Sequence, residues 1–211
     1  MKFLALTLCF AFTLQACSSK PAKEEYVPKI YAVEQQEKAS AALRAGDMKE
    51  AAAAAERAIA HDPTYPDPYV TKATVLARSG LLETALSVMD TCMTQQPEFP
   101  EGHLLRGVLN DELKRPDAAR ADFEQASKGF ATAAAAHPDN LETGIKCAVS
   151  EYLRAGMAGT RRMGALVGQH PDNMPAKFIY ERMVAGDRAF AFRWLIEMQD
   201  NSGAAPATQG K

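Results

Sequence analysis

The chain has 211 residues, of which 47% are hydrophobic, and its 24 Lys and Arg against 26 Asp and Glu give a formal net charge of −2. Such a near balance gives no support for nucleic acid as a partner, because phosphate backbones are bound by basic surfaces. After the first segment, no stretch approaches the ~20 consecutive apolar residues that a membrane-spanning helix needs. The length suits one sizeable core or a stacked array.

Residues 1–16, MKFLALTLCFAFTLQA, are predicted to be a signal peptide. Lys2 provides a short positive region, and the apolar stretch after it is too short to cross a bilayer. The sequence L-Q-A-C that ends at Cys17 resembles the lipobox of bacterial lipoproteins, in which the cysteine is acylated. Ser18 in the next position resembles lipoproteins sorted to the outer membrane of a Gram-negative cell. The alternative is an ordinary secretory signal whose cleavage site adjoins a cysteine.

Acylation of Cys17 would anchor the chain without a spanning helix, since each buried methylene contributes ~0.8 kcal/mol. Residues 17–28 follow as the acylated cysteine and a flexible tether, because they are polar and contain two prolines. The rest of the chain would then face the periplasm from the outer membrane. Apart from this covalent lipid, no cofactor is expected.

An internal repeat begins after the tether, and helical hairpins are predicted at about residues 32–65, 66–99 and 100–139. The repeated positions are small residues at helix contacts, a glycine turn and a proline stop. Ala39, Gly46, Ala51, Ala58 and Pro63 lie 34 residues before Ala73, Gly80, Ala85, Cys92 and Pro97.

The third hairpin departs from this spacing, because the proline expected at Ala131 arrives seven residues later, at Pro138. Seven residues make about two helical turns, so the second helix can lengthen and keep its buried face. A break at Lys128-Gly129 is the alternative.

Two degenerate hairpins are predicted at about 140–171 and 172–200, and residues 201–211 are predicted to be a disordered tail. The last pair consists of helices over about 174–185 and 188–199, and the second of these contains Trp194, the single tryptophan. We expect this pair to cap the end of the array, as terminal repeats do. Cys92 and Cys147 are expected to be packed thiols, although an oxidising periplasm also permits a disulfide between them.

The repeat resembles the tetratricopeptide repeat family in its small first-helix residues, its glycine turns and the A-x3-F element at Ala119 and Phe123. The resemblance implies an all-α, tetratricopeptide-like α-solenoid of about five helix-turn-helix pairs, the last two degenerate. It also implies a binding module, not an enzyme, in which the first helices line a concave groove for a protein or peptide partner.

Carried over from the family, the groove residues combine apolar and hydroxyl side chains, which suit a peptide or helical partner better than a highly charged one. They are Gln36, Ser40, Arg44, Val70, Thr71, Thr74, Arg78, Leu104, Leu105, Val108 and Asp111. The Lys and Asn positions of family members that clamp C-terminal carboxylates are not matched, so we do not expect a chaperone-tail clamp.

Catalytic and metal-binding motifs are not recognisable, and no small-molecule substrate is expected. His61, His137 and His170 stand beside prolines at predicted helix ends, where they suit the helix dipole better than a metal. The glycine-rich stretch 156–168 is interpreted as a loosened repeat turn.

The sequence therefore favours an outer-membrane lipoprotein whose repeat domain acts as a scaffold or adaptor for assembly of an envelope complex. Lipoproteins of this build resemble pilotins of pilus secretins and adaptors of peptidoglycan-cutting enzymes. The alternatives are a non-catalytic spacer between membrane and cell wall, or a small enzyme that uses the region 140–170.

Overall fold

The computed structural model describes residues 26–197. The predictions for the signal peptide, Cys17 and the tail 201–211 therefore lie outside the described residues. Within the described range the regular structure is helical and contains no strand. None of the helices in this range is both long and apolar enough to cross a membrane.

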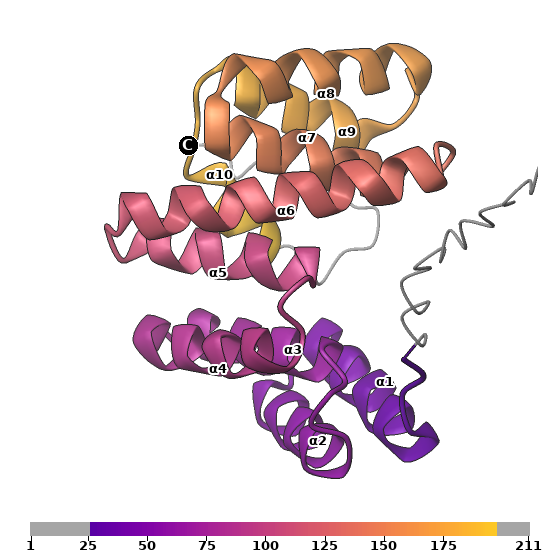
Figure 1. The fold of residues 1–211 in the computed structure, drawn as a ribbon, viewed down its shortest axis with the longest axis vertical. Helices are drawn as coiled ribbons and strands as arrows, with labels where there is room; N and C mark the ends of the chain where they lie inside the picture. Colours follow the sequence, from indigo (N-terminus) through magenta and orange to yellow (C-terminus); the bar gives the residue numbers. More distant parts are fainter. Residues whose placement is uncertain (1–25, 198–211) are drawn as a thin grey trace, which may run out of the picture.

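Pairs of antiparallel helices stack in chain order, as predicted (Figure 1). The first three pairs are α1 (Ile30–Arg44) with α2 (Met48–His61), α3 (Asp67–Arg78) with α4 (Leu82–Gln95), and α5 (Pro100–Glu112) with α6 (Pro116–Ala136). The fourth is α7 (Leu141–Ala155) with α8 (Met157–Gln169), and α9 (Met174–Val184) begins the fifth. The fold is an all-α helical repeat solenoid, which confirms the predicted class.

The turns within the first two pairs use glycines in the left-handed backbone region. Gly46 has φ 77° and Gly80 has φ 76°. Lys114 lies 34 residues after Gly80 and adopts φ 59°, so the third turn has the same backbone shape without a glycine. A Cβ is disfavoured in this region, and the third turn is therefore strained.

Helix α6 is 21 residues long and continues through Lys128-Gly129 without a break, which confirms the lengthened alternative. Phe123 and Phe130, two turns apart, are almost fully buried. Helix α6 packs on α5 and also on α7, so its extra turns bury a face against the next pair.

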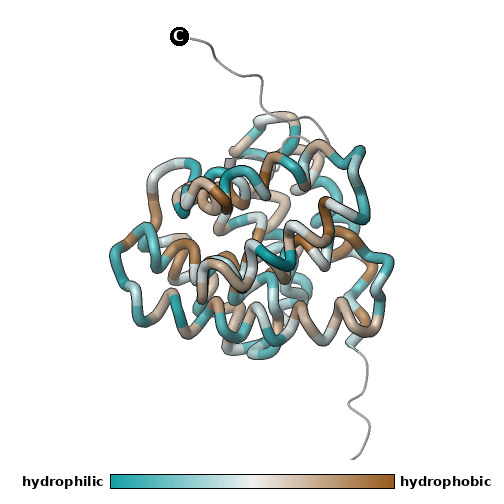
Figure 2. Tube along the Cα trace, turned by 90° about the horizontal axis from the view of Figure 1, so that it is seen from above, coloured by the Kyte–Doolittle hydropathy of each residue, from teal (hydrophilic) through white to brown (hydrophobic). Residues whose placement is uncertain are grey.

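A large apolar cluster lies where the later pairs meet, and hydrophobic segments lie toward the interior while many outer turns are hydrophilic (Figure 2). The first pair is joined mainly by alanines, with Ala39, Ala54 and Ala55 fully buried. Cys92 and Cys147 are buried free thiols, as predicted. Burial raises the pKa of the Cys92 thiol to about 12.

The start of the described chain is bound to the end of α2. The Asp62 carboxylate accepts hydrogen bonds from the Tyr26 hydroxyl at 2.5 Å and the Lys29 amide at 3.0 Å. Burial alone would raise the pKa of Asp62, but these bonds and those from Thr64 hold it well below its usual range. Part of the predicted tether is thus ordered against the first repeat.

The end of the described chain differs from the helix predicted over 188–199. A single turn, α10 (Phe190–Phe192), is followed by a short π-helix, η1 (Arg193–Glu197). These elements contact α5, two pairs back along the array, and α3, three pairs back. The final segment therefore folds over the face of the first helices instead of completing the last hairpin.

Candidate binding groove

The first helices α1, α3 and α5 present the predicted groove residues on one shared face. Side chains three or four positions apart lie on the same side of a helix. The Gln36 amide nitrogen donates to Ser40 Oγ at 3.0 Å and to Thr71 Oγ1 at 2.9 Å, which joins α1 to α3. The structure therefore brings these three predicted residues together.

The predicted residues differ in accessibility along the groove. Gln36, Thr71 and Thr74 are buried, as are the three apolar residues on α5, Leu104, Leu105 and Val108. Ser40, Val70, Arg78 and Asp111 are half-buried, and Arg44 is exposed. The α5 part of the groove is thus covered, while its α1 end is more open.

The cover over α5 is the chain itself, in residues 188–196, which we call the C-terminal segment. Arg188 Nε donates to Asp111 Oδ2 at 2.9 Å, and Arg188 Nη1 donates to the Leu153 carbonyl oxygen at 2.5 Å. The guanidinium also lies 5.5 Å from the centre of the Phe123 ring. Arg188 therefore fixes the start of the C-terminal segment across α5 and α7.

Apolar side chains of the C-terminal segment fill the groove beyond Arg188. Phe190 is buried in one cluster with Leu104 and Val108, and its ring centre lies 6.1 Å from that of Tyr152. Ile196 is fully buried in a second cluster that contains Leu105. The predicted apolar groove residues of α5 therefore belong to the same clusters as the C-terminal segment.

The far end of the C-terminal segment is held through its main chain. Arg78 Nε donates to the Ile196 carbonyl oxygen at 2.5 Å. Two predicted groove residues, Arg78 and Asp111, thus bind the two ends of one peptide segment. The face is able to hold a peptide through a carboxylate, a guanidinium and an apolar floor.

Cavities remain on both sides of the C-terminal segment. One of about 340 Å³ is lined by Leu141, Glu142, Ile145, Lys146, Asn173, Pro175, Ile179 and Trp194. Another of about 440 Å³ is lined by Asp111, Glu112, Lys114, Pro116, Arg188 and Ala189. Burial alone would lower the pKa of Lys146, but Glu142 and Glu101 outweigh burial and raise it. The lining of the first cavity thus combines apolar side chains with the charged side chains of Glu142 and Lys146.

Two buried polar atoms near α1 and α3 have no hydrogen-bond partner within residues 26–197. They are Gln36 Oε1 and Thr74 Oγ1, both on predicted groove residues. Buried polar atoms are nearly always paired with protein or water, so these two are exceptions to the rule. Both lie beneath the surface of the groove and out of reach of a ligand.

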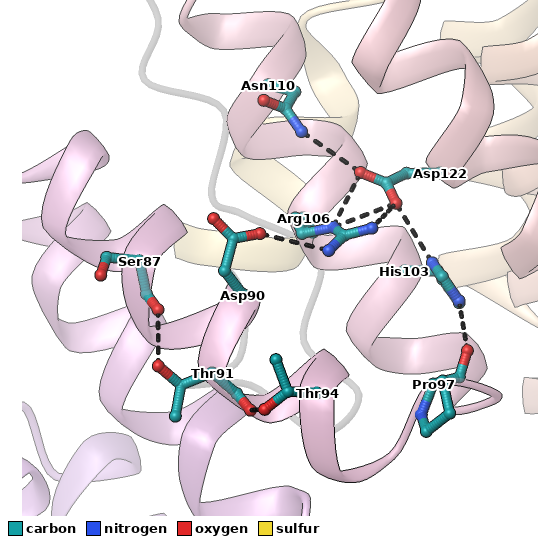
Figure 3. A network of polar contacts seen from close by, with 9 residues as sticks. All are labelled: Ser87, Asp90, Thr91, Thr94, Pro97, His103, Arg106, Asn110 and Asp122. Atoms are coloured by element: carbon teal, nitrogen blue, oxygen red, sulfur yellow. Dashed lines mark hydrogen bonds and ion pairs between the residues drawn. The ribbon is translucent and has the colours of Figure 1, made fainter.

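Behind the groove, a buried polar network that sequence reasoning missed joins α5 to α6 (Figure 3). Asp122 accepts from Arg106 Nη2 at 2.6 Å and from Asn110 Nδ2 at 3.2 Å, and His103 Nδ1 lies 3.1 Å from its carboxylate. Burial alone would raise the pKa of Asp122, but the hydrogen bonds from His103 and Arg106 and the Arg106 charge hold it below the usual value. The spacing of His103, Arg106 and Asn110 on one helix face was the available signal.

The histidines at helix ends lie where the sequence placed them. His61 ends α2 and lies 4.8 Å, between ring centres, from Tyr31, while His137 and His170 follow the ends of α6 and α8. Among the described residues no group of three or more His, Cys, Asp or Glu is placed to hold a metal ion.

Comparisons with known proteins agree on the fold. A tetratricopeptide repeat family model matches residues 42–109. A thermophilic tetratricopeptide protein of Thermus thermophilus is 23% identical, with 73% of this chain and 81% of that chain covered and a TM-score of 0.55. A search of curated proteins finds no match.

Two further solved structures are more distant. MamA from Desulfovibrio magneticus RS-1 is 18% identical over 84% of this chain and 100% of that chain, with a TM-score of 0.47. A tetratricopeptide repeat protein of Parabacteroides merdae is 18% identical over 82% of this chain and 68% of that chain, with a TM-score of 0.44. The Thermus protein supports the solenoid fold.

Proposed function

We propose that this chain is an envelope-anchored scaffold that binds a peptide segment of a protein partner in the concave groove of its first helices. The observation that carries the proposal is the seating of residues 188–196 in that groove, held at Asp111 and Arg78. A face that already holds one segment by side-chain and main-chain contacts has the chemistry to hold another. The complex served is of the pilus, secretin or peptidoglycan type.

The lipid anchor is supported by the lipobox-like sequence at Cys17 and the apolar leader before it. We expect the Cys17→Ala protein to leave the membrane fraction, because the lipid is its only proposed attachment. Ser18→Asp is the matched control, since it keeps the acylated cysteine and alters only sorting. It should stay in membranes but move from the outer to the inner one. Membrane retention of Cys17→Ala would contradict the anchor.

Binding is tested by photo-crosslinking in intact cell envelopes. Val70 is the preferred site, because it is half-buried on the more open part of the groove, whereas Thr74 is fully buried and out of reach. The matched control is a crosslinker at Thr132, which is exposed on the second helix α6. We expect a protein adduct from Val70 that is missing from Thr132. Equal adducts from both sites would overturn the groove as the binding face.

A spacer without a peptide ligand is the second candidate, and the covered α5 part of the groove favours it. A spacer would keep its cellular phenotype when Val70 is changed to Asp. Val70 packs against the apolar cluster of α3 to α5, so circular dichroism must show that the variant keeps its helices. A scaffold would lose its partner and its phenotype together. The comparison of Val70→Asp with Thr132→Asp separates the two functions.

A further inference from the structure

We propose that the C-terminal segment is a built-in ligand of the groove, and that the partner is a peptide with the same anchors. Those anchors are an arginine, an aromatic residue two positions later and an aliphatic residue six positions after that. The inference rests on the proposed function, since it specifies the peptide that the scaffold takes. Until that peptide arrives, the chain's own segment occupies the site.

The arginine anchor is defined by three kinds of contact. Arg188 faces the Asp111 carboxylate with two nitrogens, at 2.9 and 3.5 Å, and donates to the Leu153 carbonyl oxygen. Its guanidinium also lies over the Phe123 ring. A fork of donors on a planar cation matches this arrangement, and a lysine does not. The groove therefore selects arginine at the first position.

The aromatic and aliphatic anchors occupy separate apolar sites. Phe190 is 2% exposed and lies in the apolar cluster formed by α5 to α9, whereas Ile196 is 0% exposed and lies in the apolar cluster formed by α3, α4 and α5. Arg78 then binds the carbonyl of the last anchor. The segment is thus held at its arginine, at its aromatic residue and at its last residue.

The seating of the C-terminal segment is incomplete, which makes its displacement feasible. The two cavities lie beside it, one lined by Trp194 and the other by Arg188 and Ala189. Both members of the Arg188–Asp111 pair are partly exposed, with side chains 44% and 31% accessible. A partner peptide with additional residues can fill these cavities and contact more of the groove than the chain's own segment does.

The connection to α9 explains why a segment with few contacts stays bound. Helix α9 ends at Val184, and Gly186 has φ 71°, so the chain reverses within a few residues. Asp187 accepts from the Phe190 amide at 3.1 Å and from Arg193 at 2.7 Å, which orders the turn. A short connection gives an effective concentration on the order of millimolar, so the attached segment competes with free peptides.

The test measures binding of a fluorescein-labelled peptide, DRAFAFRWLI, to the purified full-length chain by fluorescence anisotropy. In the chain, Ile196→Asp should release the segment, because a carboxylate cannot stay in the apolar site. We expect the peptide to bind the Ile196→Asp protein at least tenfold more tightly than the unaltered protein. A peptide with alanine at the arginine and the first phenylalanine should not bind.

Controls separate release of the segment from loss of folding. Trp194 is the single tryptophan, so a red shift of its emission reports release, while circular dichroism reports the helices. Arg188→Ala is a second releasing variant that leaves the apolar core unchanged. Arg161→Ala is the control, because Arg161 is exposed on α8, outside the C-terminal segment and the groove, and this change should not alter affinity.

Equal peptide affinity in folded Ile196→Asp and unaltered protein would overturn the inference, and the Val70 crosslinking result would still decide the proposed function. If peptide binding is seen without any adduct at Val70, the C-terminal segment is a ligand of the groove, but the proposed function and the partner peptide both fail. A dimer that forms by exchange of residues 188–196 between copies would also overturn it, since the occupant would then be a second copy.

Discussion

Lys114 is the residue at which the repeat departs most clearly from its own rule. The equivalent positions, Gly46 and Gly80, are glycines with positive φ, and Lys114 has φ 59°. For a residue with a Cβ, the left-handed region costs roughly 1–2 kcal/mol of stability. Glycine avoids this cost, but it loses more backbone entropy on folding, which offsets part of the gain. We expect Lys114→Gly to raise the free energy of unfolding by about 0.5–1 kcal/mol in urea denaturation. Lys114→Ala is the control, and an equal gain there would show that charge and not backbone strain is responsible.

Asp122 is the residue on which the α5–α6 contact depends electrostatically. The change Asp122→Asn removes the charge that faces Arg106 and leaves buried donors poorly matched. We expect a loss of about 2–3 kcal/mol in the free energy of unfolding. Asp90→Asn is the matched control, because Asp90 faces the same Arg106 at 3.2 Å but its side chain is 59% exposed. This control should cost less than about 0.5 kcal/mol.

The stability contributed by Asp122 has a defined pH dependence. Its pKa is lower in the folded protein than in the unfolded chain, where it is about 3.9, so the folded state favours the ionised form. The contribution is complete above the unfolded value and is lost as the pH falls below about 4 toward the folded value. Between pH 7 and pH 3, the free energy of unfolding of the unaltered protein should therefore fall toward that of Asp122→Asn, as measured by denaturation. A constant difference across this range would contradict the assignment.

At the scale of elements, α8 approaches the backbone of α7 closely at Gly159. A Cβ at Gly159 would overlap the Tyr152 amide nitrogen and the Ala148 carbonyl oxygen, which are backbone atoms and cannot rotate away. Gly159→Ala should therefore destabilise the protein by about 1–3 kcal/mol in thermal or urea unfolding. Gly168→Ala in the same helix meets nothing within 4 Å and should stabilise by about 0.5–1 kcal/mol. Equal changes in stability for Gly159→Ala and Gly168→Ala would show that helix propensity, and not the contact with α7, determines the effect.

The hairpins could be predicted from the sequence because their signals are local. Gly46, Gly80 and the prolines after α2 and α4 mark turns and ends within a few residues of the helices they shape. The sequence does not decide whether α6 continues or breaks at Gly129, since Gly129 alone does not show whether α7 will cover Phe130. The last helix was misjudged in shape because its partners on α3 and α5 are distant in the sequence.

At the scale of the whole molecule, the groove was predicted as a set of positions but not as an occupied site. Family resemblance placed Arg78, Leu105 and Asp111 on one face. In the structure Arg78 and Asp111 hydrogen-bond to the C-terminal segment, and Leu105 shares an apolar cluster with Ile196. The occupant could not be foreseen, because Arg78 and Ile196 are 118 residues apart and periodicity gives no information at that separation. The Asp122 network could not be foreseen for a related reason. Its members lie on two helices, and the periodicity of one helix gives no information about the partners on another.

The contact between Arg78 and Ile196 has a consequence for how the protein unfolds. Repeat arrays usually behave as a row of units that interact with nearest neighbours and can melt from an end. Here the C-terminal segment contacts α3 of the second pair, so the first and last units of the array from α3 onward are in direct contact. Opening any one unit breaks the closure, and we expect residues 67–197 to unfold in one cooperative transition. In Ile196→Asp, hydrogen exchange should instead show α8 and α9 opening before α3 to α6, as in an open row.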